Sequence, residues 1–117
     1  MKRRALLVLG WAWAAGIVWL SLTPSPPEID FQDSDKLGHL LSYAMLMLCF
    51  VLAYRGWRAR LAHALLFLAM GVGIEFAQAA LGYRMFEGLD MLANAAGIGL
   101  GWAAGHALSP LAPRLNP

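Results

Sequence analysis

The chain has 117 residues, of which 60% are apolar and 14% are charged, and its mean hydropathy is +0.58. Soluble domains are usually about 45–50% apolar and about 25% charged, so this composition excludes an ordinary soluble domain. The formal net charge of +2 is small, and we expect no nucleic-acid partner.

Four apolar runs account for the excess of hydrophobic residues, at about 5–22, 37–54, 61–81 and 89–109. Each has roughly 18–21 residues, enough at about 1.5 Å per residue to cross a hydrocarbon core of about 30 Å. Because backbone polar groups in lipid must be satisfied within the segment, each run should be a helix. The sequence therefore predicts an all-α integral membrane four-helix bundle, a single domain over residues 1–117.

The first run follows three basic residues, Lys2, Arg3 and Arg4, as a signal peptide would. A secretory core is typically only about 7–15 residues long and ends at a cleavage site with small residues. This run is longer, and its end, Ser21 followed by Leu22–Pro24, is a poor match to such a cleavage site. We therefore expect it to be retained as the first membrane helix.

The basic residues predict the orientation of the helices. Those on one side lie before the first run, between the second and third, and after the fourth: Lys2, Arg3, Arg4, Arg55, Arg58, Arg60 and Arg114. The other side holds only Lys36 and Arg84. By the positive-inside rule, both termini are predicted to be cytoplasmic.

The second run begins with polar residues at helical spacing. Asp35, His39 and Tyr43 are four residues apart, so they share one face, and Lys36 is adjacent. A carboxylate at 35 would hold one imidazole tautomer of His39 and raise its basicity, as in proton-transfer sites. The alternative is that Asp35 only caps the helix N-terminus.

The third run carries Glu75 and Gln78 on nearly one face, with Gly71 one turn before them. Glu75 lies about 21 Å along this helix, inside the predicted bilayer. A carboxylate facing lipid is costly, so Glu75 should face the bundle interior, where the candidate partners are His39, Gln78 and Arg84. The alternative is a buried pair that only fixes helix packing.

The fourth run begins with Asp90 and Asn94, again four residues apart. Arg84, just before it, is a candidate partner of Asp90 or a contact for an external phosphate or carboxylate. Small residues continue at spacing four, which lets helix backbones approach closely. The residues Gly97, Gly101 and Gly105 should pack on another helix of this chain, with a homo-oligomer through this face as the alternative.

These polar residues should lie near the external membrane face. The hypothesis places His39 as acid or base and Glu75 as a second carboxylate. The expected ligand contacts are Asp35, Lys36, Tyr43, Gln78, Arg84, Asp90 and Asn94. No metal-ligand spacing occurs, so neither a metal nor another cofactor is predicted. Ser21 is a weaker candidate nucleophile. Because Cys49 is the only cysteine, an internal disulfide is excluded.

The order of these motifs resembles the VanZ-like family of small bacterial membrane proteins. The matching positions are Ser21 to Pro24, Asp35 to His39 with Tyr43, Glu75 to Gln78, Arg84, and Asp90 to Asn94 with Gly97. The resemblance implies a multi-pass protein of the bacterial cytoplasmic membrane. The family is named for a member associated with teicoplanin resistance, so the resemblance points to a role at the cell envelope without supplying a reaction.

Three functions remain open on the sequence. The first is an outward-facing site that binds or modifies a lipid-linked or amphipathic envelope molecule, such as a cell-wall precursor, beside membrane lipids. The second is a non-catalytic scaffold or partner subunit whose polar residues only stabilise the bundle. The third, an ion pathway, would need polar groups at every membrane depth, and the cytoplasmic halves of the first, second and fourth runs have almost none.

Overall fold

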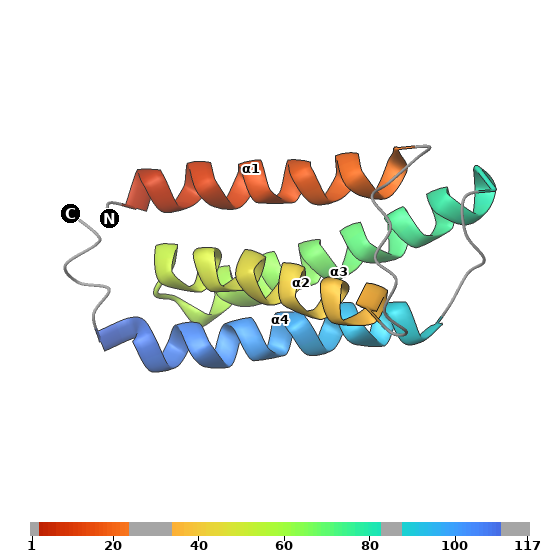
Figure 1. Ribbon diagram of the computed structural model, residues 1–117. Coiled ribbons are helices and arrows are strands. Elements are labelled where there is room, and N and C mark those ends of the chain that lie inside the picture. Colours follow the sequence, from red (N-terminus) through yellow and green to blue (C-terminus); the bar gives the residue numbers. More distant parts are fainter. Residues whose placement is uncertain (1–2, 24–33, 83–87, 111–117) are drawn as a thin grey trace.

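The computed structural model describes residues 3–23, 34–82 and 88–110, and side chains in the second range from Lys36 onward. These residues form four helices. They are α1 (Arg3–Leu22), α2 (Ser34–Ala53), α3 (Trp57–Ala80) and α4 (Gly88–Leu108). Each helix runs in the direction opposite to the one before it, along the long dimension of the molecule (Figure 1). The protein is therefore all-helical in its described part.

The bundle has two distinct ends. At the hairpin end, α1 begins, α4 ends, and the short 54–56 connection joins α2 to α3 (Figure 1). At the far end, α1 and α3 end and α2 and α4 begin. The molecule measures 45 × 25 × 22 Å, and its length matches a bilayer of about 40–45 Å including headgroups.

Among the described residues, three helices are long and apolar enough to cross a membrane: α1, α3, and α2 from Lys36 onward. The sequence predicted four such helices. α4 has 21 residues, enough to span about 31 Å. α4 is not among these three, and the polar residues Asp90 and Asn94 interrupt its apolar sequence near its start.

Large apolar side chains cover much of the surface. Trp19 is 68% exposed on α1, Trp57 63% on α3 and Leu92 63% on α4. An apolar surface of this extent is unfavourable in water and favourable against hydrocarbon. The exposed faces therefore agree with a membrane protein.

Glycines let α4 pack directly on the backbone of α2. A Cβ atom at Gly97 would collide with the Leu40 carbonyl, and one at Gly101 with the Ala44 carbonyl. A Cβ atom at Gly105 would lie 2.6 Å from Val51 Cγ1. The glycine stripe is thus buried within the chain, as the intramolecular alternative predicted, and a second copy would have to displace α2 to use it.

Aromatic rings fill the hairpin half of the bundle. Phe50 of α2 lies 5.1 Å from the Trp11 ring of α1 and 5.0 Å from the Phe67 ring of α3, centroid to centroid. His63 stacks on Phe50 and Tyr54 at 4.9 and 4.7 Å. This half is therefore a packed aromatic core joining three helices.

Arg60 fixes the turn between α2 and α3. Its Nε donates to the Tyr54 carbonyl at 2.6 Å and its Nη2 to the Val51 carbonyl at 2.9 Å. These acceptors lie at the end of α2, where carbonyls lack helical partners and a cation is favoured. The sequence analysis placed Arg60 in a loop and began the helix at residue 61. Instead α3 begins at Trp57, and Arg60 is only 6% exposed.

Candidate functional site

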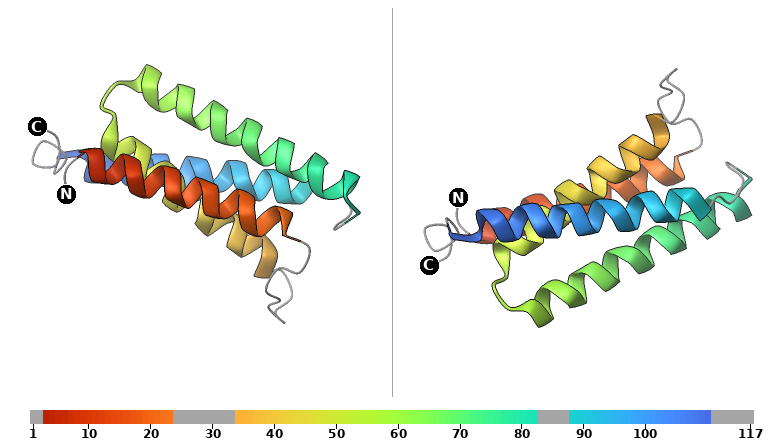
Figure 2. Two further views of the ribbon diagram at one scale, coloured as in Figure 1. Left: turned by 90° about the horizontal axis from the view of Figure 1, so that it is seen from above. Right: turned by 90° about the horizontal axis from the view of Figure 1, so that it is seen from below.

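The far end brings together the polar side chains of the bundle. Because α2 and α3 diverge from their short connection, they are well separated at the far end (Figure 2). α1 and α4 lie on opposite sides of the two diverging helices (Figures 1 and 2). Polar side chains of α2, α3 and α4 and a backbone carbonyl of α1 make the contacts found at this end.

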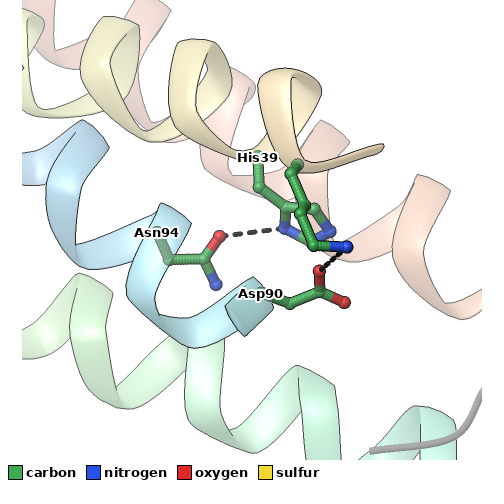
Figure 3. A network of polar contacts seen from close by, with 4 residues as sticks. His39, Asp90 and Asn94 are labelled. Carbon is green, nitrogen blue, oxygen red and sulfur yellow. Dashed lines mark hydrogen bonds and ion pairs between the residues drawn. The ribbon is translucent and has the colours of Figure 1, made fainter. Parts of the chain in front are cut away.

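His39 of α2 is held by Asn94 of α4 (Figure 3). The distance from His39 Nδ1 to Asn94 Oδ1 is 2.9 Å. An amide oxygen only accepts hydrogen bonds, so Nδ1 is the protonated nitrogen and Nε2 of the neutral ring is left as an acceptor or base. Asn94 is therefore an orienting group for His39. The side chain of Asp35, the predicted partner of His39, lies outside the described residues.

Lys36 and Asp90 form a second link between α2 and α4. Lys36 Nζ lies 3.9 Å from Asp90 Oδ1. Asp90 is fully buried in the first turn of α4, where the helix dipole favours a carboxylate, whereas the Lys36 side chain is 30% exposed. Both links lie side by side in Figure 3, so α2 and α4 present one continuous polar strip.

Tyr43 and Asn94 meet α3 at Gly71. A Cβ atom at Gly71 would lie 2.7 Å from Asn94 Nδ2 and 3.2 Å from the Tyr43 hydroxyl. Only a glycine leaves room for both groups at this depth. The sequence analysis noted Gly71 only as a neighbour of Glu75. Its position on the same face of α3 as Glu75 and Gln78 was the signal that side chains of other helices approach the α3 backbone there.

Glu75 lies one turn, or about 6 Å, from Gly71 toward the far end on the same face of α3. It is 2% exposed, so it faces the bundle interior as predicted. The Tyr43 hydroxyl reaches this side of α3 beside Gly71, one turn away. Buried carboxylates need polar surroundings, and Tyr43 belongs to those of Glu75.

Gln78 joins α3 to α1. Its Nε2 donates to the Ser21 carbonyl in the last turn of α1, at 2.8 Å. Gln78 is 5% exposed, and its Oε1 accepts no hydrogen bond among the described residues. The observed role of Ser21 is therefore that of a backbone acceptor.

The cluster stops abruptly toward the hairpin end. Between Asn94 and the buried Arg60 at the hairpin end, the buried side chains of the described residues are apolar, including Leu46, Met47, Phe50 and Ile98. This core offers no polar step for an ion, which argues against the pathway alternative. In the described ranges, no three His, Cys, Asp or Glu side chains group as metal ligands.

An open, shallow apolar surface lies on the outward side of α1, where it is lined by Ala15, Val18, Trp19, Leu22 and Thr23. Ala15 and Trp19 are exposed, whereas the buried side of α1, which holds Gly10 and Ala14, is the opposite one. This surface therefore faces away from the polar cluster.

Most of the predicted site residues are in the described structure. The structure brings together Lys36, His39, Tyr43, Glu75, Gln78, Asp90 and Asn94 at the far end. Arg84 lies outside the described residues. The contact between Gln78 and Ser21 and the role of Gly71 were not predicted.

Comparison with known proteins adds no relative: no protein family, curated protein or solved structure matches this chain. The resemblance to VanZ-like proteins stays a prediction that depends on the order of the motifs.

Proposed function

We propose that this protein is a VanZ-like component of the bacterial cytoplasmic membrane whose far end faces outward. In this proposal all four helices cross the bilayer and both termini are cytoplasmic. The polar cluster binds or modifies a lipid-linked or amphipathic envelope molecule, such as a cell-wall precursor. A relation to glycopeptide resistance is part of the proposal, motivated by the family resemblance.

One observation carries this proposal. Four polar side chains, Glu75, Gln78, Asp90 and Asn94, are at least 95% buried at one end of the bundle, whereas Arg60 is the one buried polar side chain among the described residues of the other half. Burial of such groups in a membrane segment is costly, and they usually mark a functional site. Their depth at one end favours a molecule that enters from the lipid–water boundary.

The arrangement supports acid–base chemistry or binding. His39, oriented through Nδ1 by Asn94, presents Nε2 as the base. Glu75 supplies a second carboxylate from α3, one helical turn from Gly71. Arg84 remains the proposed contact for an anion.

The test measures binding and turnover of a purified lipid-linked wall precursor. We expect His39→Ala and Glu75→Gln to weaken binding or turnover about tenfold or more, because the first removes the proposed base and the second replaces the carboxyl group by an amide that cannot ionise. His106→Ala is the matched control, since His106 is exposed near the hairpin end of α4. Wild-type behaviour of both site variants would refute this function.

The second candidate is a non-catalytic scaffold, favoured by the glycine contact between α2 and α4 and by the intrachain partner of Asn94. In a scaffold, His39→Ala and Glu75→Gln would lower thermal stability in proportion to lost function. A variant that is stable but inactive would exclude the scaffold.

A further inference from the structure

Arginines from three segments meet around Tyr54 at the hairpin end. The guanidinium carbon of Arg3, on α1, lies 4.6 Å from the centroid of the Tyr54 ring. Arg60 of α3 donates from Nε to the Tyr54 carbonyl at 2.6 Å. Arg55 directly follows Tyr54 in the 54–56 connection. Positive charges from α1, the connection and α3 are therefore gathered in one place.

The carboxylates of the described residues are too far away to balance these charges. Glu75 and Asp90 are the two carboxyl side chains that the structure describes, and both lie toward the far end. Like charges that are gathered at a surface of low dielectric constant repel one another, and an anion beside them relieves the repulsion. The hairpin end therefore favours an anionic partner.

The exposed arginines, unlike Arg60, face outward at this end. Arg60 is buried, and its Nε and Nη2 already donate to carbonyls at the end of α2. These bonds also neutralise the negative end of the α2 dipole, which would otherwise oppose an anion. Arg3, Arg55 and Arg58 are exposed. They are the groups that meet a molecule arriving from outside the bundle.

Aromatic rings position two of these guanidinium groups. Arg3 lies over Tyr54, and the guanidinium carbon of Arg58 lies 5.4 Å from the centroid of the Trp57 ring. A contact with the face of a ring holds the cation without using its N–H donors. Those donors remain for a phosphate group, which a planar guanidinium binds with two parallel hydrogen bonds.

The start of α3 adds backbone donors at the same end. Gly56 is the N-cap of α3, and no side chain caps this terminus with a hydrogen bond. The first N–H groups of a helix have no acceptor within the helix, and the positive end of the helix dipole favours an anion beside them. Arg58 lies in this first turn, so side-chain and backbone donors of α3 lie together.

Exposed apolar side chains beside the arginines indicate that the anion belongs to a lipid. Trp57, next to Arg58, is 63% exposed, and Leu61 is exposed one turn further along α3. On α1, the exposed Val8 follows Arg3 by less than two turns. Arginines at the border of a lipid-facing surface lie at the depth of the headgroups. A soluble anion would use only the charges, whereas a phospholipid also covers the apolar surface.

We infer that the hairpin end binds an acidic phospholipid, with Arg3, Arg55 and Arg58 around its headgroup phosphate and its chains along Trp57 and Leu61. The site lies at the opposite end of the bundle from the polar cluster. The inference therefore goes beyond the proposed function and does not depend on it.

Two lipids with the same chains provide the test. Native mass spectrometry of the detergent-solubilised protein gives apparent affinities for phosphatidylglycerol and for phosphatidylcholine. Both lipids contain a phosphate, but the quaternary ammonium of phosphatidylcholine cancels its net charge. We expect phosphatidylglycerol to bind roughly tenfold more tightly or better. Equal affinities for the two lipids would overturn the inference.

Protein variants locate the binding. Arg55→Gln and Arg58→Gln should each lower the affinity for phosphatidylglycerol about fivefold and change that for phosphatidylcholine little. Gly88→Asp is the matched control, because it lowers the net charge by the same amount at the exposed start of α4. An equal effect of Gly88→Asp would mean that only the overall charge matters and would overturn the site. If an arginine variant does not fold, the comparison of the two lipids on the wild-type protein still decides the point.

A competitor without chains separates a lipid from a soluble phosphate compound. We expect glycerol 3-phosphate in excess not to displace phosphatidylglycerol. Displacement at concentrations similar to that of the lipid would assign the arginines to a soluble ligand and overturn the inference. Absence of precursor binding at the far end would remove the proposed function and leave this inference standing.

Discussion

Gly71→Ala tests the packing of the polar cluster, because the added methyl group meets two site residues. It would lie 2.7 Å from Asn94 Nδ2 and 3.2 Å from the Tyr43 hydroxyl. Since α3 is a helix through this position, the contact with Asn94 Nδ2 is relieved only by moving the Asn94 side chain or a whole helix. The displaced Asn94 would lose its hydrogen bond with His39.

The magnitude follows from two costs. Overpacking by one methyl group in a close-packed interior costs about 1–3 kcal/mol. Loss of one hydrogen bond adds about 0.5–1.5 kcal/mol. Replacing a helical glycine by alanine gains about 1 kcal/mol in helix propensity, and this gain must be subtracted. Gly71→Ala should therefore destabilise the protein by about 0.5–3.5 kcal/mol.

Gly73→Ala is the matched control. It lies on the same helix, and its added Cβ atom would meet no atom within 4 Å. The helix-propensity gain is the same at both positions, so the difference between the variants isolates the contact. Thermal unfolding in detergent measures the difference in stability between the two variants, and the precursor assay measures the difference in binding. Equal stability and equal binding of the two variants would refute the geometry given for Gly71, Tyr43 and Asn94.

Two further predictions concern the helix contacts that support the site. Gly101→Ala places a methyl group against the Ala44 carbonyl and should destabilise the α2–α4 pair by about 1–3 kcal/mol, whereas Gly99→Ala, which meets nothing, should not; thermal unfolding distinguishes them. Arg60→Met leaves the end of α2 without its two side-chain donors and should cost about 1–3 kcal/mol in the same assay. The exposed Arg58→Met should be near neutral, and equal effects of the two would contradict the capping role.

The helices were predictable from the sequence because long apolar runs in lipid have no alternative to helical structure. The boundaries of the helices were less predictable at the hairpin end. Arg60 looked like a loop cation, and only its bonds to the end of α2 explain why α3 begins at Trp57. Side-chain bonds to a neighbouring helix leave no periodic signal in the sequence.

The site was predictable in position but not in its contacts. Spacing of three or four residues placed Glu75 with Gln78, and Asp90 with Asn94, on shared faces. Spacing within one helix cannot specify partners on another, so the bond between His39 and Asn94 was not predicted. The rotation of each helix about its own axis, which decides those partners, depends on packing over the whole bundle.

The most direct test of the central claim is the side of the membrane on which the polar cluster opens. Cysteines are introduced one at a time in a Cys49→Ala background, as Gly88→Cys at the far end and Arg58→Cys at the hairpin end, and intact cells are treated with a membrane-impermeant maleimide. Both positions are exposed, so access to the reagent decides labelling. We expect Gly88→Cys to be labelled in intact cells and Arg58→Cys only after permeabilisation. The reverse pattern would place the cluster at the cytoplasmic face and contradict an envelope-facing site.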